Sequence, residues 1–153
     1  FAAVLVVAGA VVALVMLNRS RTPSAPPSDP VVEDFRSVER ESIAAFNEAL
    51  RRQRAQEIDE IELATQVERS VLAPWRAMRA RVAAAPVPAA RTELYTVMRH
   101  YVDERELAWQ AYVSALRAAS DAEARPQYDL YHQKNAQAQD DARTLGGLLR
   151  PQR

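Results

Sequence analysis

The chain opens with an uninterrupted apolar run. Residues 1–17 contain no polar side chain, and Asn18, Arg19 and Arg21 follow closely. A helix that crosses a bilayer needs about 20 apolar residues, so this run is at the short end of the range. A cleaved signal peptide has a similar apolar core, but a small-residue cleavage motif follows it rather than arginines. We therefore predict a single transmembrane anchor over residues 1–17.

A polar, proline-rich stretch follows the apolar run. Residues 18–30 have proline at positions 23, 26, 27 and 30. Clustered prolines exclude a helix and favour extended polyproline II, which rises about 3.1 Å per residue. The stretch is therefore predicted to be a tether that holds the rest of the chain up to about 40 Å from the bilayer.

Beyond the tether, apolar residues recur mostly at steps of three and four, the pattern of amphipathic helices. Asp29 is suited to cap a helix that starts at Pro30. No Gly or Pro interrupts residues 31–73, and the apolar stripe keeps its phase across Pro74. We therefore predict one long helix from residue 30 to about residue 84, kinked at Pro74.

Two further helices are predicted, from about residue 89 or 92 to residue 122 and from residue 127 to residue 145. Prolines 86, 88 and 126 mark the connections, and Gly146 with Gly147 is a typical helix end. The expected fold is all-α, with an antiparallel bundle of three long helices outside the membrane. The expected segments are an anchor (1–17), a tether (18–30), a helical bundle (31–145) and a flexible tail (146–153).

The predicted helix lengths do not match. A helix over residues 30–84 would be about 80 Å long, and the next helix would cover only its second half. The first half then carries a stripe of large apolar side chains without a partner in this chain: Phe35, Val38, Ile43, Phe46 and Leu50. Either the helix breaks near residue 53 to form a four-helix bundle, or the stripe binds another protein. Because no Gly or Pro lies near residue 53, we predict a continuous helix and a partner-binding stripe.

Composition removes several classes of function. The chain has no Cys, which excludes disulfides, cysteine-ligated metals and cysteine nucleophiles. Three Gly are too few for a phosphate-binding glycine-rich loop. The 20 basic residues balance the 20 acidic ones, which argues against nucleic-acid binding by bulk charge.

The two histidines are the main candidates for chemistry. His100 has Asp103 and Glu104 at helical spacing, and His132 has Asp129. Such pairs ligate metals in helix bundles when two of them face each other. Folding the chain back near residue 123 leaves the two histidines about 21 Å apart along the bundle, too far to share an ion. We therefore predict no catalytic, cofactor-binding or metal-binding residue.

Two other groups of residues have alternative interpretations. The first contains aromatic residues that form either a core with polar tips or a partner interface: Tyr95, Tyr101, Trp109, Tyr112, Tyr128 and Tyr131. The second contains Arg51, Arg52 and Arg54, which either are solvated or meet lipid phosphate or an acidic partner.

These observations favour a non-enzymatic, single-pass accessory subunit of a larger membrane complex. Its expected partners are other subunits of that complex and the lipid bilayer, and a homo-oligomer through the helix over residues 30–84 is possible. A short anchor followed by a tether is typical of exported domains, so we expect the bulk of the chain on the periplasmic or outer face. The scarcity of Lys beside abundant Arg and Ala suggests a bacterial source. The alternatives are an anchored sensor or chaperone that binds a ligand or unfolded protein, and a metal- or cofactor-dependent enzyme.

Overall fold

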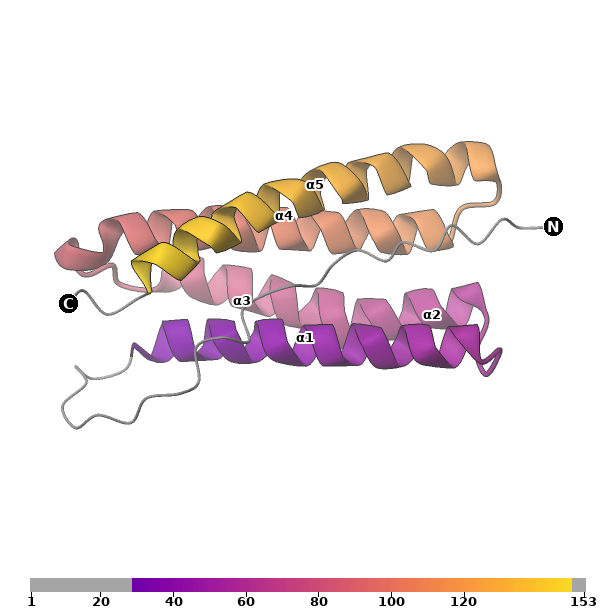
Figure 1. Ribbon diagram of the computed structural model, residues 1–153, viewed down its shortest axis with the longest axis horizontal. Coiled ribbons are helices and arrows are strands. Elements are labelled where there is room, and N and C mark those ends of the chain that lie inside the picture. The colour runs from indigo at the N-terminus through magenta and orange to yellow at the C-terminus, as the bar shows by residue number, and fades with distance from the viewer. Residues whose placement is uncertain (1–28, 150–153) are drawn as a thin grey trace.

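The computed structural model describes residues 29–149, which form helices joined by short connections (Figure 1). In chain order these are α1 (Pro30–Arg54), α2 (Glu60–Val67), a π-helical turn (Glu68–Leu72), α3 (Ala73–Ala84), a 3₁₀ turn (Ala89–Arg91), α4 (Thr92–Leu116) and α5 (Asp121–Leu148). Because α2, the π-helical turn and α3 follow one another without a gap, they form one rod. The described chain is therefore an antiparallel bundle of four rods, which confirms the all-α prediction. The alternative with a break near residue 53 is correct, and the preferred bundle of three long helices is wrong.

The predicted anchor and nearly all of the predicted tether lie outside the described residues, as does the end of the predicted tail. Within residues 29–149, no helix combines the length and the apolar character that crossing a bilayer requires.

The first rod ends where the sequence contains neither Gly nor Pro, so the prediction of one helix over residues 30–84 is wrong. Gln56 reverses the chain with a φ of 58°, in the left-handed region. The Glu57 N–H donates to the Arg52 carbonyl at 2.9 Å, which closes the end of α1. Asp59 then starts α2 by accepting a hydrogen bond from the Glu62 N–H at 2.8 Å. A strong N-cap, rather than a helix breaker, thus sets the position of the turn.

The second rod passes through Pro74 without ending, as its apolar phase predicted. Proline has no N–H to give to the carbonyl four residues earlier. The π-helical turn Glu68–Leu72 lies directly before Pro74 and widens the helix where that bond is missing. Trp75, Met78 and Val82 are buried on the far side of the proline.

The connection between α4 and α5 lies earlier in the chain than predicted. α4 ends at Leu116, and Ser120 caps α5 by accepting from the Glu123 N–H at 3.3 Å. Pro126 therefore lies inside α5 and does not end the connection. The two glycines predicted to end the helix, Gly146 and Gly147, are also inside α5, and neither has a positive φ.

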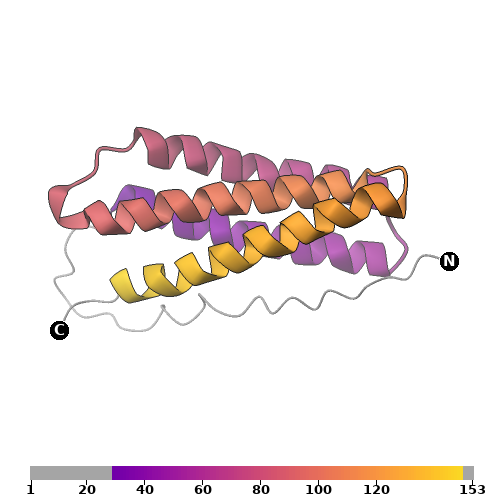
Figure 2. The same ribbon diagram turned by 90° about the horizontal axis from the view of Figure 1, so that it is seen from above.

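The four rods are not evenly spaced. α4 and α5 make the most extensive contact, and α5 is inclined to α4 (Figure 2). The alanines Ala108, Ala111 and Ala138 are buried and permit this close approach. α1 packs on the rod of α2 and α3 instead. Among the described residues, no Cα of α1 lies within 8 Å of a Cα of α5. The edge between these two helices, called the α1–α5 edge below, is therefore the one side of the described bundle where neighbouring rods make no close backbone contact.

Candidate functional site

The stripe predicted to bind a partner lies largely in the chain's own core. Phe35 is 2% exposed and belongs to the core. Val38, Phe46 and Leu50 are half-buried and pack against that core. Ile43 is also half-buried but is not among the side chains packed against the core. The break at residues 55–59 lets α2 and α3 cover the whole of α1, so the reason for assigning these five residues to another protein disappears.

Two aromatic layers cross the bundle interior. In the first, Phe35 meets Trp75 and Tyr101 at ring-centroid distances of 6.1 and 5.2 Å. In the second, Phe46 packs edge-on against Trp109 at 4.7 Å and Tyr112 at 5.5 Å. The aromatic residues of α4 therefore form core contacts, as one of the two interpretations of the sequence predicted.

A polar layer lies between these aromatic layers, centred on Arg105 of α4. Its guanidinium carbon is 5.6 Å from the ring centroid of Trp75 and 5.2 Å from that of Trp109. Its Nη1 donates to Asn135 Oδ1 of α5 at 2.6 Å. No carboxylate among residues 29–149 lies within ion-pair distance of this guanidinium. The two indole faces attract the cation but do not neutralise its charge.

Beside this layer, polar pairs join α4 to α5. Glu104 is 7% exposed, and its Oε1 accepts a hydrogen bond from Lys134 Nζ at 3.3 Å. The same Nζ forms an ion pair with Glu104 Oε2 at 3.0 Å. His100 Nδ1 lies 2.5 Å from Asp141 Oδ2, and its Nε2 lies 3.7 Å from Glu104 Oε1. The hydrogen bond to Asp141 is the main cause that raises the pKa of His100 above its usual value, and the charges of Glu104 and Asp103 add to it.

The two histidines have separate surroundings. His132 is exposed and contacts the Tyr131 ring at a centroid distance of 5.2 Å. Its spacing partner Asp129 forms no ion pair with it among the described residues. Within residues 29–149, no group of three His, Asp or Glu side chains is arranged to hold a metal ion.

The junction between the predicted tether and the bundle is firmly held. The Asp29 carboxylate accepts from the Val31 N–H at 3.0 Å, from Tyr95 Oη at 2.9 Å and from Arg91 Nη1 at 2.9 Å. Burial alone would raise the pKa of Asp29, but these hydrogen bonds lower it on balance. The first residue of the described chain is thus tied both to α1 and to the start of α4.

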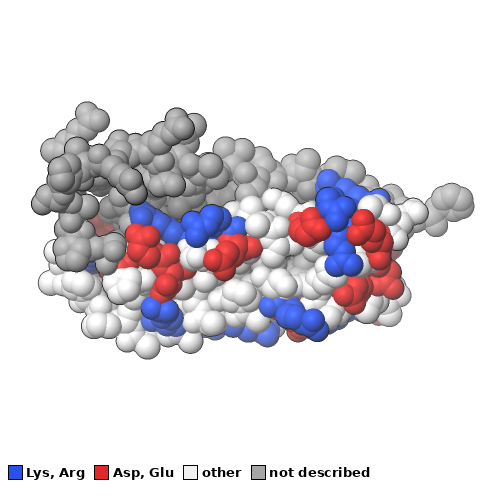
Figure 3. Space-filling view, turned by 90° about the horizontal axis from the view of Figure 1, so that it is seen from below, with Lys and Arg blue, Asp and Glu red and all other residues white. Residues whose placement is uncertain are grey.

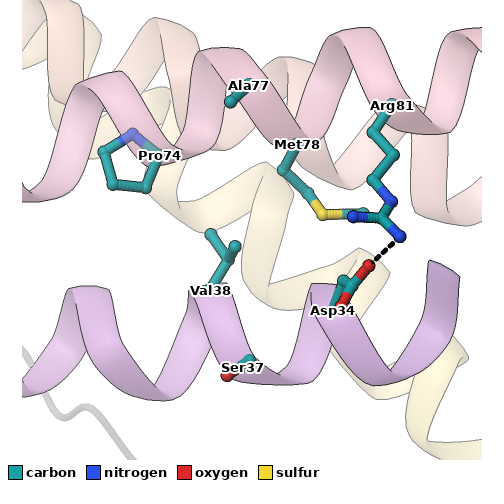
Figure 4. A pocket seen from close by; sticks show the side chains of 7 residues that line it. All are labelled: Asp34, Ser37, Val38, Pro74, Ala77, Met78 and Arg81. Atoms are coloured by element: carbon teal, nitrogen blue, oxygen red, sulfur yellow. Dashed lines mark ion pairs between the residues drawn. The ribbon is translucent and has the colours of Figure 1, made fainter. Parts of the chain in front are cut away.

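A shallow groove of about 220 Å³ lies between α1 and α3 (Figure 4). Val38 and Met78 form part of its floor, and Pro74 lies at one end. Asp34 and Arg81 form an ion pair across the other end and neutralise each other. The groove therefore offers no unpaired charge to a ligand.

Charged side chains of both signs alternate over the face of the bundle seen in Figure 3. Arg51 lies 2.8 Å from Glu48 and 3.3 Å from Glu57, and Arg52 lies 3.4 Å from Glu57. Two of the arginines considered as lipid or partner contacts are thus paired within the chain. Exposed pairs of this kind contribute about 0–1 kcal/mol each to stability.

No protein family model, curated protein or solved structure matches this chain. The site must therefore be interpreted from its own geometry.

The sequence interpretation missed Arg105 and Ser42, although a signal for both was present. On the helix predicted over residues 89–122, the apolar positions Tyr101 and Ala108 are seven residues apart, and Arg105 lies between them at the same helical phase. Ser42 similarly stands between Phe35 and Phe46 on the buried side of α1, where it is 1% exposed. A polar residue at an apolar phase was the available indication of a buried polar layer.

Proposed function

We propose that the chain is a non-enzymatic, single-pass membrane-anchored accessory subunit of a larger membrane complex, with its bundle on the periplasmic or outer face. The observation that carries this proposal is the clamp on Asp29 by Tyr95 and Arg91. A tether that ends in a rigid clamp delivers one particular end of the bundle toward the membrane. Such an arrangement suits a domain that presents a defined face to a membrane-bound partner.

The proposed partner face lies on α4 and α5. Leu107 and Leu130 are 42% and 38% exposed, among the few large apolar side chains that the bundle leaves in solvent. The contacts of Arg105 with Asn135 and of Tyr112 with Tyr128 set the antiparallel register of the two helices. In that register Leu130 lies about 5 Å along the axis from the level of Leu107. Two apolar side chains at nearly the same level make a small anchor point for a neighbouring protein.

Site-specific photocrosslinking in native membranes tests this face. A photoreactive residue at position 107 or 130 should yield a crosslink to a defined membrane-complex subunit. The same residue at position 77, which is exposed on α3, serves as the matched control and should yield none. Equal crosslinking from all three positions, or none from 107 and 130, contradicts the proposed face.

The anchor and the topology are tested separately. Deletion of residues 1–17 should release the bundle from the membrane fraction. Because the chain has no Cys, an Ala77→Cys variant carries a single thiol that a membrane-impermeant maleimide can report. Labelling in intact cells supports an outer-face bundle, and labelling only after lysis contradicts it.

A second candidate, an anchored ligand-binding sensor, is favoured by one observation. Several buried hydrogen-bond donors around Arg105 have no partner among the described residues. A sensor needs such an unsatisfied interior site, whereas an accessory subunit does not.

A further inference from the structure

The polar layer at the centre of the bundle contains several buried polar atoms without a hydrogen-bond partner among the described residues. One of them is an acceptor, Glu104 Oε2, whose charge is balanced by Lys134 Nζ at 3.0 Å. The other four at this level can donate. Nε1 of Trp75, Nε1 of Trp109, Nε of Arg105 and Oγ of Ser42 are all buried, and none has a hydrogen-bond partner among residues 29–149. The residues themselves are enclosed: Trp75 is 0%, Trp109 3% and Ser42 1% exposed. Buried polar groups in folded proteins nearly always have partners, so a concentration of unpaired donors indicates a missing acceptor.

These groups lie near one another. Arg105 stands between the two indoles, as its distances to their ring centroids show. Phe46 of α1 contacts Trp109 of α4, and these two helices run parallel. Ser42 and Arg105 each lie four residues, or about one helical turn, before that contact, so they are at the same level of the bundle.

Arg105 has no ion-pair partner at this level among residues 29–149. Arg105 is half-buried, and its only hydrogen bond among the described residues is to the neutral Asn135. Glu39 of α1 accepts a hydrogen bond from Tyr101 and forms no ion pair with Arg105. An unneutralised guanidinium with indole N–H and hydroxyl donors around it is suited to an anion, because those nitrogens can donate but cannot accept.

We propose that this layer binds a small oxyanion, a carboxylate or phosphate group, which accepts hydrogen bonds from Arg105, Trp75, Trp109 and Ser42. The proposed entrance is the α1–α5 edge, because neighbouring rods make no close backbone contact there in the described chain. This site is independent of the accessory role proposed above. It neither requires nor excludes a protein partner on α4 and α5.

Intrinsic fluorescence is a direct assay, because Trp75 and Trp109 are the only two tryptophans of the chain. The full chain in mild detergent is titrated with sodium acetate in one arm and sodium phosphate in another. A saturable change in emission is expected in at least one arm, and comparison of the two arms shows which oxyanion the site prefers.

Variants separate binding at the site from an effect of ionic strength. Arg105→Gln should abolish the saturable change. Arg99→Gln removes an exposed arginine of the same helix and should leave the change intact. No saturation in the native chain, or the same saturation in Arg105→Gln, overturns the proposal.

A second variant keeps the test decisive if Arg105→Gln does not fold. Trp109→Phe retains a large aromatic ring but removes the indole N–H, and Trp75 remains as the reporter. Weakening of acetate or phosphate binding by tenfold or more supports the site. Unchanged affinity in a folded Trp109→Phe chain overturns it, and so does a high-resolution structure grown in either salt that shows only water against Arg105.

Discussion

Replacement of Phe35 by Ala tests whether α1 belongs to a self-contained bundle. Phe35 is 2% exposed and packs edge-on against Trp75 and Tyr101. Truncation of a buried Phe to Ala typically costs about 3–5 kcal/mol, because transfer energy is lost and a cavity remains. Domains of this size are stable by about 5–15 kcal/mol, so Phe35→Ala should remove about a fifth or more of the total.

Ile43→Ala is the matched control on the same helix. Ile43 is half-buried and is not among the side chains packed against the core, so its truncation should cost about 1 kcal/mol or less. Both values are obtained from urea unfolding of the full chain in mild detergent, followed by far-UV circular dichroism. If Phe35→Ala costs no more than Ile43→Ala, α1 does not contribute to the core as described. The partner-binding interpretation of its stripe would then be restored.

Three further tests, at Asp29, Gln56 and His100, have defined outcomes. Asp29→Ala should lower the free energy of unfolding by about 1–2 kcal/mol at pH 7, and Asp29→Asn by less, because asparagine still caps a helix. Since the pKa of Asp29 is lowered in the fold, the ionic part of its contribution is present above its ordinary pKa of 3.8 and is lost as the pH falls through the lowered value. Urea midpoints of Asp29→Asn and the native chain should therefore converge in acid. Gln56→Gly should raise stability by about 0.5–1 kcal/mol, because glycine adopts a φ of 58° without strain, whereas Gln53→Gly inside α1 should lower stability by a similar amount. The pKa of His100 is raised, chiefly by its hydrogen bond with Asp141, so this stabilisation is complete below pH 6.5 and disappears as the pH rises through the raised value. His100→Gln should therefore flatten the pH dependence of the free energy of unfolding, by less than about 1 kcal/mol, as measured from urea unfolding at several pH values.

The helical class and the proline-marked loop follow directly from the sequence. Steps of three and four between apolar residues define amphipathic helices wherever they continue. Pro86 and Pro88 separate the second rod from α4, as expected. The end of α1 was missed because the absence of Gly and Pro near residue 53 was given more weight than the apolar gap there. The informative signals were the apolar gap from Leu50 to Ile58 and the pair Asp59 and Glu62, which has the spacing of a capping box.

The candidate site was less accessible to sequence reasoning than the fold. Periodicity shows that Trp75 and Trp109 are buried, but it does not show that both flank one guanidinium. That juxtaposition depends on contacts between residues 30 positions apart along the chain. The pairing of His100 with Asp141 likewise depends on the register of α4 against α5, which begins at Ser120 rather than near Pro126.

The uneven spacing of the rods also sets an order for folding. Contacts between α4 and α5 join residues about 30 positions apart, such as Arg105 and Asn135, whereas Phe35 must find Tyr101 across 66 positions. Closing a short loop costs less chain entropy, so we expect the α4–α5 hairpin to form early and α1 to dock late. Under native conditions the reverse sequence should appear as subglobal opening, with the amides of α1 exchanging with deuterium before those of α4. The α1–α5 edge would then be the side from which the bundle opens.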